Sequence, residues 1–426
     1  MDTLFSDVTV VTFDKIQKHA YVGVENGKIA YIGDKAVPAA QIIDGRDRAL
    51  LPGLVNAHTH ISMAAFRGWG DGHNLQDWLN DYIFPYEDKM TAEQAAICAE
   101  LCLAEAIAAG TTAVLDMYYF YEKSAEVFAN SGINCNLSRS LVAFGDWDAR
   151  SDHRVSQADE LFDQWDGFDN GRVKVFPSIH AEYTSNEHLW RGYKEHLAAK
   201  NRDHHLHIHL SETRREHDEC VARHGKTPAE LFDSYGLLDR AVLAHGVYLT
   251  KRDGEILAKN RASLVHNPVS NLKLASGVAP LRRLLDQNIN VALGTDGVSS
   301  NDNMDLFEEL KLSAILHRGV TGDPLNISAG DALKLATQNG AAALDRPDTG
   351  KLEVGAWADL ILLDFSRPQF YPRHDERALA VYAARGGDVC LTMARGRILY
   401  RDGEWLTIDI ERVRHKLNTV VSGLFA

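Results

Sequence analysis

The sequence has no run of basic residues and carries an excess of acidic ones. Its 45 Lys and Arg are outnumbered by 59 Asp and Glu, which gives a formal net charge of −14. Without a basic stripe, a chain of this charge is not expected to bind nucleic acid or an anionic membrane. The chain also lacks an apolar run near the roughly 18 residues that span a bilayer, and residues 1–7 lack a secretory signal pattern. We therefore expect a cytoplasmic protein.

Cysteine is scarce as well. The chain has five cysteines, an odd number, and they are scattered without the Cys-x-x-Cys spacing of redox or zinc motifs. Such cysteines are typical of buried, reduced thiols, and this argues against a disulfide framework. The five are Cys98, Cys102, Cys135, Cys220 and Cys390.

What the chain does have is length and apolar residues, with 426 residues of which 45% are hydrophobic. This length exceeds the usual size of one domain and favours a large barrel with an accessory domain. Short β-rich runs punctuated by glycine occupy residues 3–12 and 19–33, and the same texture returns at 358–363 and 389–393. We expect the two ends of the chain to pair into one small β-sandwich domain.

Between these ends, short apolar runs alternate with helix-like stretches. There are eight such runs, the number of strands in a (β/α)₈ barrel of the α/β class. The first run ends at residue 58, and the other seven lie at 111–117, 133–137, 173–177, 206–210, 242–244, 263–265 and 291–293. We predict a barrel over 51–349, the β domain from 1–50 and 350–410, and a C-terminal helix over 411–426. Residues 146–171, rich in Asp and Trp, are predicted as a loop or lid.

Histidine and aspartate side chains follow the predicted strands, where a barrel places its chemistry. His58 and His60 are two residues apart and therefore share one face of a strand. The others are His207 and His209, His245, His266 and Asp296. Core packing hardly explains such a set, because each buried polar group needs a partner. A divalent metal would supply one.

Three neutral imidazoles and one carboxylate suit a divalent ion with an open position for water. We predict His58, His60, His209 and Asp296 as the ligands of one Zn²⁺ per subunit, with iron, manganese or cobalt as alternatives. His207 lies one pleat deeper than His209, so it is expected to be a core histidine.

Several motifs together resemble the amidohydrolase superfamily, and the likeness covers essentially the whole chain. Within it, the chain is similar to the methylthioadenosine/S-adenosylhomocysteine deaminases. The motifs are Pro52-Gly53-Leu54-Val55-Asn56-Ala57-His58-Thr59-His60, His209-Leu210-Ser211-Glu212-Thr213, His245-Gly246, Ser270-Asn271-Leu272-Lys273-Leu274-Ala275-Ser276-Gly277 and Gly294-Thr295-Asp296-Gly297. The resemblance implies a hydrolytic deaminase for a purine nucleoside such as 5′-methylthioadenosine, S-adenosylhomocysteine or adenosine. It also implies a homo-oligomer.

The resemblance implies catalytic roles as well. Glu212, three residues beyond His209, matches the proton shuttle of the family, and His245 matches the histidine that orients the attacking water. Asp296, which would touch both metal and water, can take the proton from that water. Dinuclear members of the superfamily use a carboxylated lysine from the fourth strand, but Lys174 here lies in mid-strand, so we expect a single metal. His266 resembles a residue that shapes the pocket.

Substrate-binding residues follow from the same likeness. Glu87 matches a carboxylate that accepts hydrogen bonds from the ribose hydroxyls, and Arg139 matches an arginine on the ribose and 5′ side. His180 matches a histidine near the purine or ribose. A second family arginine corresponds to either Arg150 or Arg154, between which the sequence does not choose.

Two further positions bear on the 5′ group. Trp78 is a candidate to stack on an apolar substituent, although a Trp in an amphipathic helix is core as often. The family usually has proline where this chain has Glu182, so a changed preference at the 5′ position is expected.

Two alternatives remain open from the sequence. A relative acting on guanine, a pterin or a chlorinated triazine would keep the metal ligands but would not need the ribose reader Glu87. A non-catalytic scaffold would keep only the fold, which the intact set of histidines and carboxylates disfavours.

Overall fold

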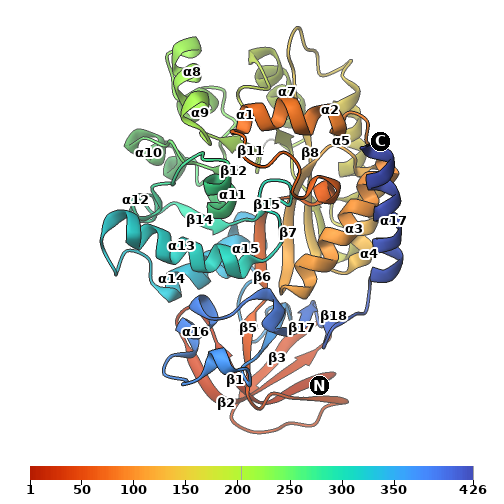
Figure 1. Cartoon of the computed structure of the whole chain (residues 1–426), viewed down its shortest axis with the longest axis vertical. Coiled ribbons are helices and arrows are strands. Elements are labelled where there is room, and N and C mark those ends of the chain that lie inside the picture. Colours follow the sequence, from red (N-terminus) through yellow and green to blue (C-terminus); the bar gives the residue numbers. More distant parts are fainter. Residues whose placement is uncertain (203, 426) are drawn as a thin grey trace.

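The computed structural model describes residues 1–202 and 204–425. It contains two sheets, and Figure 1 shows a barrel with helices around it above a smaller β domain. The larger sheet is parallel and runs in the order β14-β13-β12-β11-β10-β8-β7-β6-β15, with β9 beside β8. Its strands are β6 (Leu54–His60), β7 (Thr111–Tyr118), β8 (Asn134–Leu141), β9 (Val173–Val175), β10 (Ser178–Ile179), β11 (His207–Leu210), β12 (Val242–His245), β13 (Ser263–His266), β14 (Asn290–Leu293) and β15 (Asp296–Gly297). The predicted fold class is confirmed.

The fourth predicted strand is divided into β9 and β10. Pro177 lies between them, and proline has no N–H to donate to a strand ladder. The other seven predicted runs each form one strand at the predicted place.

The last barrel segment returns to the first. β15 pairs in parallel with β6, and Asn56 and Thr295 exchange two hydrogen bonds: the Asn56 amide donates to Thr295 Oγ1 at 2.8 Å, and the Thr295 N–H donates to Asn56 Oδ1 at 3.0 Å. Gly294 permits this approach, because a Cβ there would lie 2.8 Å from the backbone oxygen of His58. A larger residue would push the two strands apart.

Helices follow the strands and surround the barrel (Figure 1). Those up to the middle of the chain are η1 (Ile61–Phe66), α1 (Leu75–Asp77), η2 (Trp78–Ile83), α2 (Phe84–Glu87), α3 (Ala92–Ala108), α4 (Tyr121–Ser131), α5 (His153–Trp165), α6 (Phe168–Gly171), α7 (Glu187–Ala199) and α8 (Arg214–His224). The later ones are α9 (Pro228–Ser234), α10 (Lys251–Lys259), α11 (Pro268–Lys273), α12 (Leu281–Asp286), α13 (Leu306–Thr321), α14 (Ala329–Lys334), η3 (Leu335–Asn339), α15 (Gly340–Ala343), η4 (Pro368–Phe370), α16 (Glu376–Tyr382), η5 (Gly386–Asp388) and α17 (Ile410–Leu424).

The prediction of a loop or lid over 146–171 is wrong for much of this stretch. Asp152 caps a helix, α5, by accepting a hydrogen bond from the Arg154 N–H. The helix buries Val155, Ala158, Leu161 and Phe162, which lie three or four residues apart and so on one helical face. Composition rich in Asp and Trp concealed this periodicity.

The second sheet joins both ends of the chain. β5 pairs antiparallel with β16, so that the N-terminal and C-terminal strands form one sheet. Its strands are β1 (Thr3–Val11), β2 (Ile16–Glu25), β3 (Lys28–Gly33), β4 (Gln41–Asp44), β5 (Arg48–Pro52), β16 (Leu360–Asp364), β17 (Val389–Ala394), β18 (Arg397–Arg401) and β19 (Glu404–Trp405). Helix α17 follows and buries Val413, Val420 and Leu424; Ala426, the last residue of the predicted C-terminal helix, lies outside the described residues.

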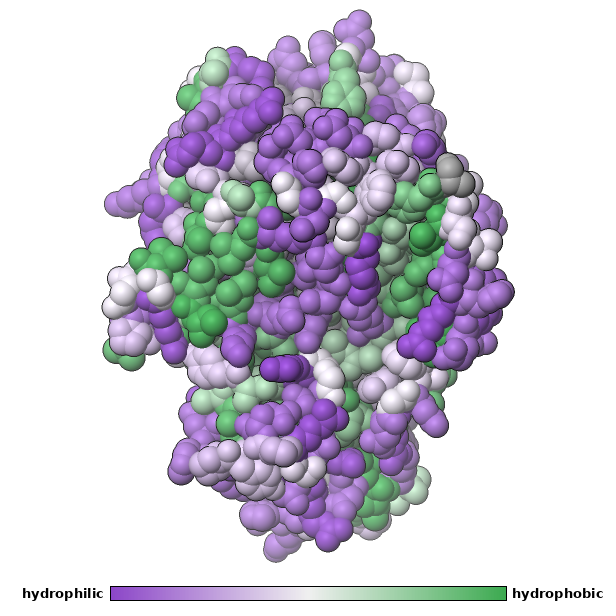
Figure 2. Space-filling view, viewed as in Figure 1, coloured by the Kyte–Doolittle hydropathy of each residue, from purple (hydrophilic) through white to green (hydrophobic). Residues whose placement is uncertain are grey.

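The surface is mostly hydrophilic, with an apolar area where Figure 1 places α13 (Figure 2). Ile315 and Val320 on this helix are exposed, as is Leu325 just after it. Among the described residues, no helix has the length and hydropathy needed to cross a bilayer. The five cysteines are free, and all except Cys390 are buried.

The buried carboxylate of Asp359 links the two sheets. It accepts hydrogen bonds from Asn134 Nδ2 at 3.0 Å, from the Arg395 N–H at 2.7 Å and from Thr349 Oγ1 at 2.8 Å. We expect Asp359→Ala to lower the free energy of unfolding by about 3 kcal/mol, because it leaves buried donors unpaired. Thermal unfolding would check this, with the exposed Asp348→Ala as control. Equal midpoints for the two variants would contradict it.

Candidate metal centre and catalytic site

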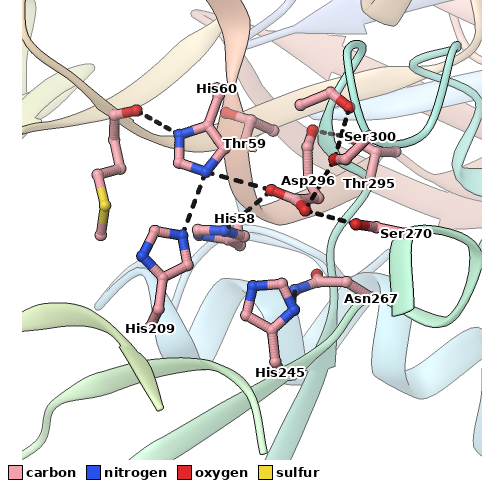
Figure 3. Close-up of polar contacts among 12 residues, drawn as sticks. His58, Thr59, His60, His209, His245, Asn267, Ser270, Thr295, Asp296 and Ser300 are labelled. Carbon is pink, nitrogen blue, oxygen red and sulfur yellow. Dashed lines mark hydrogen bonds and ion pairs between the residues drawn. The ribbon is translucent and has the colours of Figure 1, made fainter. Parts of the chain in front are cut away.

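Four predicted metal ligands converge at the carboxyl ends of three barrel strands. His58 and His60 lie on β6, His209 on β11 and Asp296 on β15, and their four ligand atoms lie within 4.8 Å of one another. Asp296 Oδ1 is 3.3 Å from His58 Nε2 and 3.2 Å from His60 Nε2, while His60 Nε2 is 3.2 Å from His209 Nε2. Figure 3 shows His60 between Asp296 and His209, with a dashed contact to each.

Hydrogen bonds on the outer side of the rings fix which nitrogen faces the centre. His60 Nδ1 lies 2.7 Å from the Met117 carbonyl oxygen, and His209 Nδ1 lies 2.7 Å from the His180 carbonyl oxygen. Because a carbonyl only accepts, both Nδ1 atoms must donate, and the Nε2 lone pairs point inward. The Nε2 of His58 is buried and has no hydrogen-bond partner. A divalent cation would satisfy all three nitrogens, so the residues fit a metal.

Two of the three rings are neutral, as metal ligation requires, and the third is drawn toward positive charge by Asp296. Burial lowers the pKa of His58 to about 4 and holds the pKa of His209 well below its usual value, so both rings are neutral. Burial also lowers the pKa of His60, but the hydrogen bond and the charge of Asp296 outweigh it and raise this pKa to about 9. The cluster therefore attracts positive charge.

His207 supports His58 from behind. The two rings are joined by a hydrogen bond of 2.8 Å between His58 Nδ1 and His207 Nε2, and Ser138 Oγ lies 3.0 Å from His207 Nδ1. His207 is fully buried and lies outside the four-atom cluster. His207 thereby orients His58, one of the predicted metal ligands.

Asp296 divides its two oxygens between different partners. Oδ1 faces the histidines, while Oδ2 accepts hydrogen bonds from Ser270 Oγ at 2.6 Å and Ser300 Oγ at 2.9 Å. The residue has a φ of 61°, a left-handed conformation that is uncommon outside glycine and costs free energy. The two serines hold the carboxylate in this strained position, a pattern the sequence did not disclose.

Asp116 on β7 holds the backbone on either side of His60. It accepts hydrogen bonds from the Ile61 N–H at 2.6 Å, from Thr59 Oγ1 at 3.0 Å and from the Tyr121 hydroxyl at 2.7 Å. Asp116 was not among the residues predicted from the sequence. The available signal was a lone carboxylate within Thr111–Tyr118, a strand that is otherwise neutral and buried throughout.

Glu212 and His245 lie beside the cluster. Glu212 Oε2 is 3.7 Å from His245 Nε2, and Ser276 Oγ donates to Glu212 Oε1 at 3.3 Å. The Nδ1 of His245 lies 2.8 Å from Asn271 Oδ1, while Figure 3 shows the contact of this ring with Asn267. Burial raises the pKa of Glu212, so its carboxyl group can hold a proton nearer neutral pH than an exposed glutamate.

The carboxylate of Glu216 fixes the turn that presents Glu212. One of its oxygens accepts the Ser211 N–H at 2.8 Å and the other accepts the Glu212 N–H at 2.7 Å. Ser211 has a φ of 50°, so the turn is strained and needs such support. This role was not predicted. The only hint in the sequence is that Glu216 lies four residues after Glu212, at the start of the next helix.

Two other candidates have partners of their own. The Lys174 Nζ lies 2.9 Å from Asp345 Oδ2, and Lys174 is outside the four-atom cluster. His266 contacts His317, with 3.1 Å between the two Nε2 atoms, and it does not line the cavity above the cluster.

A cavity of about 590 Å³ opens above the cluster, and it contains three of the predicted substrate residues, Trp78, Glu87 and His180. Burial raises the pKa of Glu87 to about 7, against the lowering effect of a hydrogen bond with Tyr118. The His180 Nδ1 lies 2.9 Å from Thr184 Oγ1, and burial lowers its pKa to about 3. Trp78 donates its indole N–H to the Trp69 carbonyl oxygen at 3.2 Å.

The predicted arginines do not line this cavity. Arg139 donates to Gln157 Oε1 at 2.7 Å and faces a separate cavity of about 330 Å³. Arg154 forms an ion pair of 2.5 Å with Asp152, and Arg150 is exposed.

Glu182 also lies outside the cavity lining. Its carboxylate pairs with Arg223 at 2.5 Å and with His224 at 3.2 Å. The negative charge that replaces the family's proline is therefore compensated by the end of α8.

A (β/α)₈ barrel with a histidine and aspartate cluster at its strand ends defines the class of metal-dependent barrel hydrolases. The sequence profile of the amidohydrolase family matches residues 49–399. The chain belongs to the amidohydrolase family.

Its relatives cover the full length of the chain. A 5-methylthioadenosine/S-adenosylhomocysteine deaminase of Caldanaerobacter subterraneus subsp. tengcongensis is 37% identical over 425 residues, or 98% of this chain and 97% of the relative. A 5′-deoxyadenosine deaminase of Methanosarcina acetivorans is 36% identical over 430 residues, or 100% and 99% of the two chains.

A similar solved structure is that of an adenosine deaminase from Xanthomonas campestris with bound zinc. It has a TM-score of 0.94 and 31% identity, and the match covers 100% of this chain and 98% of the other.

We expect His209→Ala to lose its stoichiometric divalent metal, because one of four converging donors is removed. Metal analysis of the purified variant by inductively coupled plasma mass spectrometry would test this. The matched control is Glu212→Gln, which lies in the same turn but outside the cluster. Loss of metal from the control would make Glu212 a ligand and contradict the assignment.

Proposed function

We propose that the protein is a zinc-dependent hydrolytic deaminase that converts an adenosine derivative to the inosine-type product and ammonia. The observation that carries this proposal is the pair of buried residues Glu212 and His245 beside a four-donor cluster at the base of one cavity. Full-length likeness to two kinds of adenosine-derivative deaminase supports it.

His58, His60, His209 and Asp296 would hold the zinc ion. When bound, such an ion lowers the pKa of a coordinated water from 15.7 to about 7 and thereby supplies a nucleophile at neutral pH. The bound zinc of the similar adenosine deaminase supports the choice of metal.

The chain's own residues would move the protons. Asp296 Oδ1 takes a proton from the attacking water while Ser270 and Ser300 hold its other oxygen. Asn271 accepts from His245 Nδ1 and so leaves Nε2 to hold the water beside Glu212. Glu212, whose pKa is raised by burial, gives its proton to the ring nitrogen of the purine, which makes the adjacent carbon electrophilic.

The water oxygen would bond to the amine-bearing carbon, and the hydroxyl of this adduct would return a proton to Glu212. The proton held by Asp296 would pass to the amine, the carbon–nitrogen bond would break, and ammonia would leave. The ring keeps the oxygen as a keto group. Glu87, buried in the wall of the same cavity, would accept hydrogen bonds from the two vicinal ribose hydroxyls.

Replacement of the proton shuttle should abolish most of the activity. We expect Glu212→Gln to lower kcat by roughly 100-fold or more, the usual contribution of a general acid–base group, while metal content stays unchanged. The control is Glu219→Gln, a half-exposed carboxylate on the helix that follows. Ammonia release assayed with 5′-methylthioadenosine would measure both. Near-normal turnover by Glu212→Gln would exclude the assigned role.

The substrate class can be tested with a panel of aminated purine bases, nucleosides, pterins and triazines. We expect ammonia release from adenine nucleosides, and we expect Glu87→Ala to raise KM for them at least tenfold, because the ribose hydroxyls lose their acceptor. Activity confined to free bases, or an unchanged KM in the variant, would instead favour an enzyme for guanine, a pterin or a triazine. A metal-loaded protein without any turnover would favour a scaffold.

A further inference from the structure

One wall of the cavity above the cluster is formed by a segment with several acidic residues, but the side chains that face the cavity are mostly apolar. Figure 1 shows α1 and α2 lying across the mouth of the barrel. Residues 75–88, which form this wall, contain four acidic residues and no basic one. The side chains that the wall turns into the cavity are apolar or aromatic, apart from Glu87: Leu75, Trp78, Leu79, Ile83 and Phe84.

The rest of the lining adds two more carboxyl groups, from Glu212 and Asp296. Among the described residues that line the cavity, none is lysine or arginine. Apart from a metal and the histidines around it, the cavity therefore offers no cationic side chain to a ligand.

The cations nearest in sequence to these segments are engaged elsewhere. Lys89 directly follows the wall, and its Nζ lies over the ring of Tyr86 at 4.7 Å. Arg139 is held by Gln157 behind the lining residue Tyr119, 5.6 Å from that ring, and Arg154 is paired with Asp152. Arg215 and Arg223 line a neighbouring cavity that shares Leu79 and Phe84 with this wall, and they pair with Glu219 and Glu182. Lys273, which precedes the lining residue Leu274, is paired with Asp302.

The ribose and its 5′ substituent would meet this wall together. Glu87, the proposed ribose reader, is three residues from Phe84 and four from Ile83 in a helical segment, so the three side chains lie on one face. A substituent next to the ribose would therefore contact apolar side chains. An apolar group gains free energy there, whereas a carboxylate would lose its hydration without gaining a counter-ion.

We propose that the cavity selects adenine nucleosides whose 5′ carbon carries hydrogen or a neutral apolar group, such as an alkylthio group. Nucleosides whose 5′ substituent ends in a carboxylate are poor substrates. This inference rests on the proposed deaminase function and specifies its substrate class.

The test compares kcat/KM of the metal-loaded enzyme for 5′-deoxyadenosine, 5′-methylthioadenosine, S-adenosylhomocysteine and the methyl ester of S-adenosylhomocysteine. The ester keeps the length and the ammonium group but removes the carboxylate. We expect the first two to be the best substrates and S-adenosylhomocysteine to be at least 100-fold poorer. The ester should recover at least tenfold over the free acid.

Two outcomes would overturn the inference while leaving the deaminase function intact. One is a kcat/KM for S-adenosylhomocysteine within tenfold of that for 5′-methylthioadenosine. The other is an ester as poor as the acid, since length rather than charge would then limit the reaction. Absence of turnover with every nucleoside would overturn the proposed function itself.

A variant tests the same point by adding the missing charge. Leu79 is buried in the wall and lines the cavity. Leu79→Arg should raise the ratio of kcat/KM for S-adenosylhomocysteine to that for 5′-methylthioadenosine by at least tenfold. Leu79→Met, a neutral change of similar length, should leave the ratio unchanged. Circular dichroism would first show that both variants are folded. An equal ratio in the two folded variants would contradict the inference. The substrate series with the unaltered enzyme tests the inference even if a variant fails to fold.

Discussion

The site depends on an arrangement that is unfavourable without a cation. The Nε2 atoms of His60 and His209 lie 3.2 Å apart, and the carboxylate of Asp296 lies 3.2 Å from His60 Nε2. Such groups repel one another unless a cation lies between them. The surrounding hydrogen bonds hold them in place: two carbonyl oxygens fix the rings, two serine hydroxyls fix the carboxylate, and Asp116 fixes the backbone beside His60. The fold thus holds these donors in an order that a bound cation would make favourable, and in this sense the centre is preorganised.

Much of this was accessible from the sequence because a barrel gathers its strand ends at one mouth. Alternation of side chains along a strand placed His58 and His60 on the same face, and the apolar runs gave the strand order. Other features depend on tertiary distances that no spacing encodes. Arg139 turns toward Gln157 because α5 packs there, and α5 itself was hidden by its polar composition. The role of Glu216 follows from a left-handed turn at Ser211, and a serine in the sequence does not predict such a turn.

Charge explains why the same centre can serve different substrates. In the proposed reaction, the histidines and carboxylates at the floor of the cavity act on the amine-bearing end of the heterocycle. The wall from residues 75–88 lies at the other end and contributes shape and potential rather than chemistry. In a family that shares one reaction, such a wall is where selectivity can change without loss of rate. Glu182 illustrates the opposite case, since its carboxylate pairs with Arg223 and lies outside the cavity lining.

The reciprocal hydrogen bonds between Asn56 and Thr295 join residues 239 positions apart. They lie on the same seam that brings Asp296 to His58 and His60, with Gly294 pressed against the His58 backbone. Contacts between such distant segments must close a long loop of chain, which costs entropy before the contact is gained. During synthesis, the first ligands therefore emerge long before their carboxylate partner exists, and no complete centre can form on a partial barrel. A metal that binds only the closed barrel would stabilise the contact between β6 and β15 by mass action.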